Sequence, residues 1–183
     1  MKLSFHTRTH ELKQQLAALR PRLYRSALAW CGNRQLADDL VQETLAKALG
    51  KVGNLKDSGS LKSWAFSILA NCHRDHYRRS RPKQEYQDLP DECQPTADQL
   101  LQTRETVARV RASIERLSSG QRAVLALVDL EDFSYAEVSN ILQIPIGTVM
   151  SRLNRARQAL RQLLLAEGRV SKPIKRGHLE RIK

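Results

Sequence analysis

The segment from Phe133 to Arg161 constrains the fold of this chain more than any other, because it has the pattern of a helix-turn-helix. Ser134 followed by Glu137 is a capping-box pattern, which predicts a short first helix that stops near Gln143. A proline and a glycine then punctuate the predicted turn. The first helix is predicted to bury an apolar face made of Ala136, Val138, Ile141 and Leu142.

The second helix of this motif is predicted from Thr148 onward, and as far as Arg161 it carries four arginines and no acidic residue. Helical spacing predicts a buried stripe of Val149, Leu153, Ala156, Leu160 and Leu164. At about 100° per residue the opposite side carries Ser151, Asn154, Arg155 and Gln158, and the flanks carry Thr148, Arg152, Arg157 and Arg161. Arginine and asparagine can bond base edges, whereas flanking arginines can neutralise phosphates. The pattern favours DNA binding over the alternative of a solvated basic helix.

Composition indicates an all-α chain built from two small helical domains joined by a flexible linker. Only 41% of the 183 residues are apolar, which is modest for one large core, and no run alternates long enough between apolar and polar residues to suggest a sheet. The formal net charge of +12 is concentrated in the first 80 residues and in the tail. Such charge favours a polyanionic partner, although it does not by itself distinguish DNA from RNA or an anionic membrane.

Changes in composition along the chain predict four segments. Residues 1–80 form the first helical domain, and residues 81–104, which are acidic and contain prolines, form the linker. Residues 105–167 form the second domain, with the helix-turn-helix. Residues 168–183 form a basic tail, which either adds phosphate contacts or is a plain disordered extension.

Three helical patterns are expected in the first domain. Pro21 breaks the amphipathic pattern of residues 11–32 near Arg20, and Asn33 is placed to cap a helix over residues 35–49. A longer helix is expected over residues 61–79, with an apolar stripe of Leu61, Trp64, Ala65, Ile68, Leu69 and Cys72.

Three side chains of this longer helix have open or structural interpretations. Phe66 and Tyr77 fall roughly opposite the stripe, where they either stack on bases or pack against the chain. Asp75 points to the inner side, and we expect it to pair with Arg79 or with the preceding loop.

The sequence argues against a disulfide-stabilised secreted protein, a membrane protein, a metalloprotein and an enzyme. Cys31, Cys72 and Cys93 are odd in number and widely spaced, which predicts free thiols and a reducing compartment. No signal peptide or membrane-spanning run is present, so a cytoplasmic bacterial protein without membrane insertion is expected. Carboxylates near Asp38 lie on different sides of their helix, and the histidine pairs do not form a convincing zinc site. We therefore expect no catalytic residue, no metal and no cofactor.

Three segments in one order carry a family resemblance: RLYRSALAWCGNRQLADDLVQETLAKAL, then LKSWAFSILANCHRDHYRRSRP, then LSSGQRAVLALVDLEDFSYAEVSNILQIPIGTVMSRLNRARQAL. Together they resemble the bacterial extracytoplasmic-function (ECF) sigma factors of the sigma-70 family, over nearly the whole chain. The resemblance implies an alternative sigma factor that binds RNA polymerase core, recognises the minus-35 and minus-10 promoter elements and promotes promoter opening. It also implies control by an anti-sigma factor.

The resemblance assigns roles to three groups of residues. The resemblance implies that Asp39, Gln42 and Glu43 dock on the largest subunits of the polymerase core. The alternative is that these residues form a solvated helix face. Capture of the unpaired minus-10 element falls to Ser63, Ser67, Asn71, Arg74 and Arg78. Recognition of the minus-35 element falls to Thr148, Ser151, Arg152, Asn154 and Arg155.

Two departures and one rival interpretation remain. Met150 stands where many relatives carry arginine, and Asn154 stands where the residue is often apolar or aromatic, so the promoter motif cannot be transferred from a relative. A dimeric helix-turn-helix regulator that binds duplex DNA without being a polymerase subunit is the alternative function, and it predicts tight binding by the isolated protein to a palindromic site.

Overall fold

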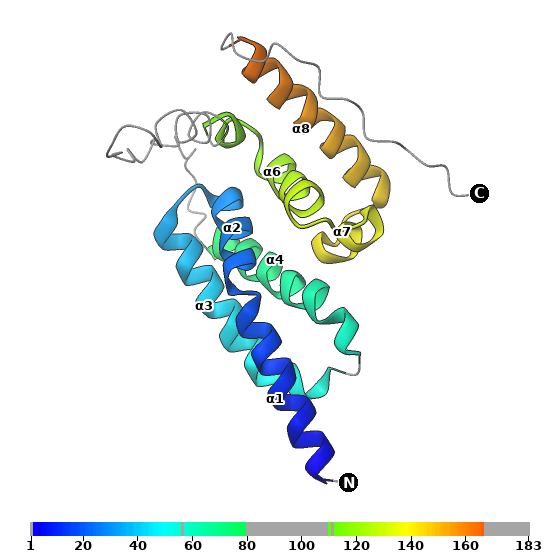
Figure 1. The fold of residues 1–183 in the computed structure, drawn as a ribbon. Helices are drawn as coiled ribbons and strands as arrows, with labels where there is room; N and C mark the ends of the chain where they lie inside the picture. Colours follow the sequence, from blue (N-terminus) through cyan, green and yellow to red (C-terminus); the bar gives the residue numbers. More distant parts are fainter. Residues whose placement is uncertain (1, 56, 80–109, 111, 167–183) are drawn as a thin grey trace, which may run out of the picture.

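The computed structural model describes residues 2–55, 57–79, 110 and 112–166, and every regular element in these ranges is helical. This confirms the predicted all-α class. The helices form two groups, which we call the first lobe (residues 2–79, α1 to α4) and the second lobe (residues 112–166, α6 to α8) (Figure 1). The predicted linker, the basic tail and Cys93 lie outside the described residues. No helix in the described ranges has the length and hydropathy needed to cross a bilayer.

The first lobe consists of α1 (Lys2–Ala18), α2 (Arg20–Cys31), α3 (Arg34–Lys51), two short 3-10 turns η1 (Val52–Asn54) and η2 (Ser58–Ser60), and α4 (Leu61–Arg79). The predicted break falls at Leu19, and Pro21 lies in the first turn of α2, where its missing N–H costs nothing. Gly32 ends α2 with a φ of 69°, a left-handed conformation that favours glycine. The Asn33 side chain then accepts a hydrogen bond from the Leu36 N–H at 2.9 Å, which confirms the predicted cap.

The second lobe contains α6 (Ser119–Leu125), a π-helical turn η3 (Ala126–Leu130), α7 (Tyr135–Leu142) and α8 (Ile146–Ala166). The predicted capping box is present at α7, because Ser134 Oγ accepts from Glu137 N–H and Glu137 Oε2 accepts from Ser134 N–H. The first helix of the motif ends at Gln143, whose φ of 55° is left-handed, as expected near that residue.

Two details of the second lobe differ from the sequence interpretation. Helix α8 begins at Ile146, two residues before Thr148, because the Pro145 carbonyl already accepts hydrogen bonds from the N–H groups of Thr148 and Val149. Ala136 is exposed and was wrongly assigned to the buried face of α7. It lies about 200° around the helix from Val138, which is buried, and so it faces solvent.

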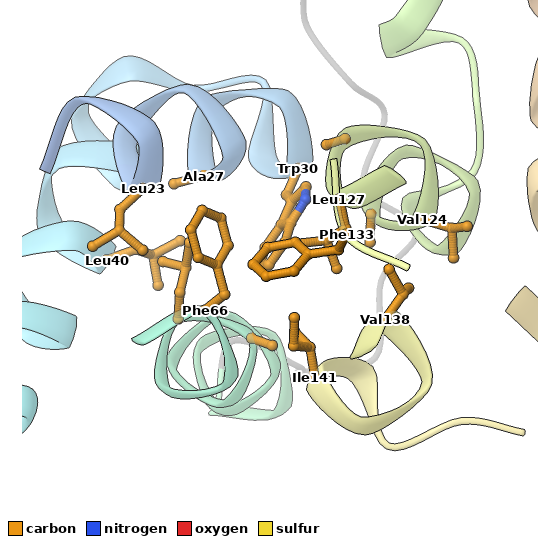
Figure 2. Packing of buried hydrophobic residues seen from close by; sticks show 14 of the residues in the cluster. Leu23, Ala27, Trp30, Leu40, Phe66, Val124, Leu127, Phe133, Val138 and Ile141 are labelled. Atoms are coloured by element: carbon orange, nitrogen blue, oxygen red, sulfur yellow. The ribbon is translucent and has the colours of Figure 1, made fainter. Parts of the chain in front are cut away.

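The two lobes pack against each other through one continuous apolar cluster, which includes residues of α2, α3, α4, α6, α7 and α8 (Figure 2). Its centre is an edge-to-face contact between the rings of Phe66 in α4 and Phe133 before α7, with ring centroids 5.1 Å apart. Phe66 is 0% exposed, so in this arrangement it packs in the core. Helix α4 therefore buries two faces, one inside the first lobe and one against α7.

The predicted apolar stripe of α4 is correct in part. Leu61, Ala65, Leu69 and Cys72 are buried as expected, whereas Trp64 and Ile68 are half-buried. Asp75 pairs with Arg78 at 3.2 Å, so the expected pairing with Arg79 is wrong. Residues three and four positions after Asp75 both lie on its side of the helix, and the structure pairs it with the nearer one.

Candidate nucleic-acid interface

Helix α8 lies on the side of the second lobe away from the first lobe (Figure 1), and one of its faces is polar and exposed. Val149, Leu153 and Ala156 are buried against the second lobe and fix the rotation of the helix. That rotation leaves Ser151, Asn154 and Arg155 exposed, on the side opposite the buried stripe. Within the described part of the chain, no hydrogen bond or ion pair engages the side chains of Asn154 and Arg155, so both are available to a ligand.

The flanks of α8 are held by the second lobe itself. The guanidinium of Arg152 lies over Gly120 of α6, so close that a Cβ at that glycine would be 3.0 Å from Arg152 Nη1. Arg157 donates two hydrogen bonds to Asp129, one of them 3.2 Å long, and this ion pair raises the pKa of Arg157. Thr148 is half-buried. These flanking contacts hold the exposed face of α8 in one orientation.

Two apolar residues also project from the first turns of α8. Ile146 is 48% exposed and Met150 53% exposed, one helical turn apart. The sequence interpretation noted Met150 only as a departure from the family pattern and missed Ile146, although their spacing of four residues places them on one side. Exposed methyl and thioether groups beside Asn154 suit apolar contact with thymine methyl groups in a major groove.

The predicted minus-10 residues follow one face of α4, and each makes a polar contact within the chain. Ser63 donates to the Ser60 carbonyl and Ser67 to the Ser63 carbonyl. Arg78 pairs with Asp75. These three contacts are local and lie inside the first lobe.

Arg74 is hydrogen-bonded to the other lobe, and Asn71 is hydrogen-bonded to Arg74. Arg74 Nη2 donates to the carbonyl of Leu142, in the last turn of α7, at 3.0 Å, and Arg74 Nη1 donates to Asn71 Oδ1 at 3.1 Å. A C-terminal carbonyl of a helix lacks an intrahelical partner and carries partial negative charge, so an arginine is well matched to it. The structure thus brings one predicted DNA-binding residue of the first lobe, Arg74, into contact with the second lobe, while Asn71 accepts its hydrogen bond from Arg74 within α4 and both side chains remain exposed.

The predicted docking residues lie on α3. Asp39 and Gln42 are exposed, and Glu43 is half-buried and pairs with Lys47 at 2.7 Å. The opposite side of α3 is fixed by buried residues, among them Leu40 and Thr44, which the sequence interpretation did not place inward. Helix α3 packs on α1, α2 and α4, and Asp39 and Gln42 face solvent.

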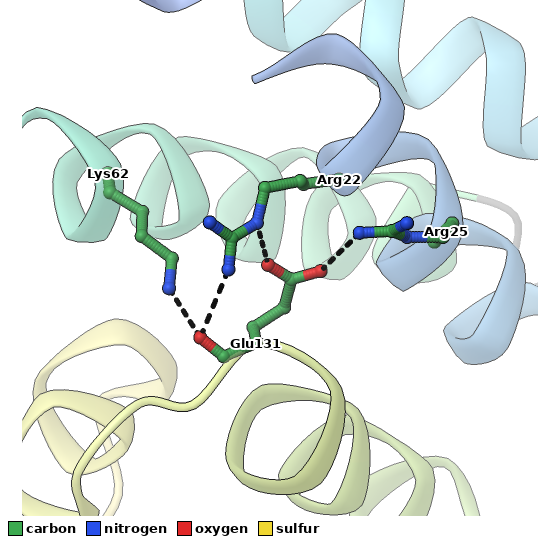
Figure 3. Close-up of polar contacts among 4 residues, drawn as sticks. All are labelled: Arg22, Arg25, Lys62 and Glu131. Atoms are coloured by element: carbon green, nitrogen blue, oxygen red, sulfur yellow. Dashed lines mark hydrogen bonds and ion pairs between the residues drawn. The ribbon is translucent and has the colours of Figure 1, made fainter. Parts of the chain in front are cut away.

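A polar cluster that sequence reasoning missed connects the lobes at Glu131 (Figure 3). Glu131 follows η3 and is 0% exposed, and its Oε2 accepts a hydrogen bond from Arg22 Nε at 2.6 Å. Arg25 Nη2 lies 3.9 Å from Oε1, which has no hydrogen-bond partner. Arg22 Nη2 at 3.4 Å and Lys62 Nζ both donate to the Glu131 carbonyl.

The environment of Lys62 reflects this crowding of cations. Its amine lies 4.1 Å from the centroid of the Phe133 ring, over its face. Partial burial, and secondly the Arg22 cation, lower the pKa of Lys62. No local sequence pattern signals the cluster, because its members are separated by as many as 109 positions.

His73 is the most strongly perturbed titratable group described. It is half-buried on α4, edge-on to the indole of Trp30, and its Nε2 has no hydrogen-bond partner. Burial, followed by the neighbouring His76, Arg122 and Arg74, lowers its pKa from 6.5 to about 4. His73 is therefore neutral at physiological pH.

The described residues contain no metal-binding cluster and no disulfide. No group of three or more histidine, cysteine or acidic side chains there could hold a metal ion. Cys31 and Cys72 are free thiols, as predicted, and burial raises the pKa of Cys31.

Comparison with protein families finds two matches in one chain. The model of Sigma-70 region 2 matches residues 16–82, and that of Sigma-70, region 4, matches residues 108–160. The ECF RNA polymerase sigma factor EcfG of Rhodopseudomonas palustris is 36% identical over 164 residues, covering 87% of this chain and 88% of that protein. SigE of Mycolicibacterium smegmatis, also an ECF sigma factor, is 33% identical over 78% of this chain and 57% of its own length.

Solved structures show the same arrangement of helices. The sigma factor RpoE of Bartonella quintana, in complex with the anti-sigma factor NepR, matches with a TM-score of 0.68 and 29% identity. The match covers 86% of this chain and 98% of that one. CnrH, in complex with the cytosolic domain of CnrY, shares the fold at a TM-score of 0.64 and 24% identity, over 91% and 96% of the two chains.

Proposed function

The chain belongs to the ECF sigma factors of the sigma-70 family, and on that premise we propose that its two lobes recognise the two elements of one promoter while it is bound to RNA polymerase core. Members of this family are transcription initiation factors, so initiation is the function of this chain. The first lobe corresponds to region 2 and the second lobe to region 4. The protein acts in the bacterial cytoplasm, where its polymerase and promoters are.

The second lobe reads the minus-35 element through α8. Arg155 and Asn154 are exposed, without intramolecular partners in the described part of the chain, and their planar groups match purine edges. Ser151 lies beside them, and Thr148 and Arg152 lie at the flank. The single observation that carries the proposal is this free polar face, on the second helix of a helix-turn-helix, in a chain that also contains region 2.

The first lobe captures the opened minus-10 element through α4. Ser63, Ser67 and Asn71 offer hydrogen-bonding groups for exposed bases, and Arg74 and Arg78 offer cations for phosphates. The chain supplies no chemistry to opening. It stabilises the open promoter by binding exposed bases better than duplex, and differential affinity is all that a binding protein can contribute to that equilibrium.

Two protein partners are proposed. Asp39, Gln42 and Glu43 dock on the largest subunits of the polymerase core, where an exposed acidic edge on a basic lobe steers orientation. An anti-sigma factor holds the chain inactive until it is released. The structure of the Bartonella quintana relative with NepR supports this second partner.

Transcription in vitro tests the proposal. Purified chain is mixed with core polymerase and genomic fragments. We expect transcripts from discrete promoters only when the chain and the core polymerase are both present. The rival function, a dimeric regulator of duplex DNA, predicts instead tight binding of a palindromic site by the isolated chain and no transcripts. Failure of the chain to co-elute with core polymerase would overturn the sigma assignment.

A further inference from the structure

The first turns of α8 expose two large apolar side chains that the core does not use. Ile146 is 48% exposed and Met150 is 53% exposed, whereas Val149, which lies between them in the sequence, is 0% exposed. Neither exposed side chain belongs to an apolar cluster in the described part of the chain. Single exposed apolar residues are ordinary on protein surfaces, so the pair is informative only through what surrounds it.

The pair continues into the polar face that is proposed to read DNA. Ile146, Met150 and Asn154 are spaced by four residues, so they form one row along the helix. Neighbours in this row are about 6 Å apart along the helix axis. The N-terminal part of the second helix of a helix-turn-helix is the part that meets base edges. The apolar pair therefore lies at the end of α8 that enters a groove, beside the exposed amide of Asn154.

The charge around the row favours DNA over a protein as its occupant. From Ile146 to Ala166 the helix carries four arginines and no acidic residue, and such a surface attracts a polyanion. An apolar row inside a cationic surface matches a major groove, which has phosphates along its edges and thymine methyl groups on its floor.

We propose that Ile146 and Met150 are specificity-determining residues that contact thymine methyl groups of the minus-35 element, next to an adenine bonded by Asn154. The proposal rests on the proposed function and specifies its DNA sequence, because it requires A·T pairs at the positions that this row meets. The flexible thioether of Met150 adapts its shape to a methyl group, but it has no hydrogen-bond donor for the acceptors of guanine.

A uracil scan of the minus-35 element tests the proposal. Deoxyuridine pairs with adenine as thymidine does and lacks only the 5-methyl group. Each thymine of a promoter found by transcription in vitro is replaced in turn, on either strand, and initiation by the full chain with core polymerase is measured at subsaturating enzyme. We expect about fourfold less initiation for each contacted thymine, as the burial of one methyl group implies. Uracil in the spacer between the two elements should have no effect.

Substitutions assign the contacted thymines to the two side chains. Met150→Gln keeps the length of the side chain and removes its apolar end, so it should abolish the uracil effect at one position. Met150→Leu should keep that effect, and Ile146→Ser should abolish the effect at another position. Leu165→Ala is the matched control, because Leu165 is 47% exposed on the same helix, about five turns farther along, and its scan should match wild type. All three side chains are exposed, so the melting temperature should not change.

Three results would overturn the proposal. The first is a minus-35 element that contains no thymine on either strand, and the second is a scan in which no uracil lowers initiation. The third is an equal loss for Ile146→Ser and Met150→Gln on thymine and uracil promoters together with weaker binding to core polymerase, which would make the row a surface for a protein.

The outcomes also separate the proposal from the proposed function. If no uracil lowers initiation at promoters that still need the minus-35 element, the sigma function stands and only the apolar contacts are wrong. If core polymerase gives no promoter-specific transcripts, the sigma function fails. The scan is then made on duplex sites that the isolated full chain selects from random sequence, where a flat scan, or no selected site, again overturns the proposal.

Discussion

Helices α4 and α8 are both proposed to bind promoter DNA, yet the fold treats them differently. Helix α8 has one buried stripe, and its opposite face is exposed with Asn154 and Arg155 unengaged in the described part of the chain. Helix α4 is buried on two sides, and its Arg74 donates to the last turn of α7 and to Asn71. The difference teaches that a helix packed on one side keeps a whole face for a ligand, whereas a helix that joins two lobes uses part of its surface for that packing.

The largest effect on initiation is expected from a substitution on the exposed face of α8. Arg155→Ala should lower initiation about 10- to 100-fold at promoters that depend on the minus-35 element, because a bidentate arginine contact with a base is worth about 1–3 kcal/mol. Transcription in vitro on matched promoters with and without that element measures the loss. The melting temperature should not change, since the side chain has no described intramolecular partner. Gln162→Ala, an exposed change farther along α8, is the control, and an equal loss there would show that Arg155 has no special role.

Burial of His73 on α4 should make the stability of the protein depend on pH. Because the folded pKa of His73, about 4, is below its ordinary value of 6.5, the unfolded chain binds more protons between these values. The stability is therefore complete above about pH 6.5 and falls as the pH drops toward 4, by about 1–2 kcal/mol between pH 7 and pH 5. Urea unfolding at both pH values should show this fall in wild type and in His10→Gln, an exposed control, and a smaller fall in His73→Phe. An equal fall in all three proteins would remove His73 as the cause.

A third surface, on α3, is proposed to bind core polymerase, and we expect its contribution to be independent of α4 and α8. Asp39→Arg should weaken binding to core polymerase about tenfold, because a positive charge replaces the negative charge that is proposed to steer docking. Binding of labelled core by biolayer interferometry measures the change. The same reversal at Glu11, an exposed residue of α1, should leave core affinity close to wild type. Full core affinity of Asp39→Arg would withdraw the docking assignment.

The smallest effect is expected at Asn71, because two consequences of its loss oppose each other. Asn71→Ala removes a proposed contact with exposed bases, but it also frees Arg74, proposed to bind phosphates, from a hydrogen bond within α4. We expect about threefold less promoter opening with unchanged recruitment, since a single neutral hydrogen bond contributes about 0.5–1.5 kcal/mol. Permanganate reactivity near the start site measures opening, and reactivity equal to wild type at saturating polymerase would refute the role of Asn71 in base capture.

Local signals in the sequence predicted the helices and many of their ends. The Asn33 cap, the Ser134 capping box and the end of α7 at Gln143 were all predicted, because each depends on residues within four positions of one another. The exposed face of α8 was also predicted, since one stripe of apolar residues fixes the rotation of a helix that packs on a single side. The roles of the site residues remain predictions that the experiments above address.

The sequence by itself determined the all-α class, the helix-turn-helix and the family, because helical periodicity, capping and motif order are all written in short stretches of chain. Only the tertiary structure decided that Phe66 is buried, that Arg74 is held by α7, and that Glu131 meets Arg22, Arg25 and Lys62. The physical reason is distance along the chain. Burial of a second face of α4, and compensation of one charge by another 109 positions away, depend on how the lobes pack, and no local pattern encodes that packing.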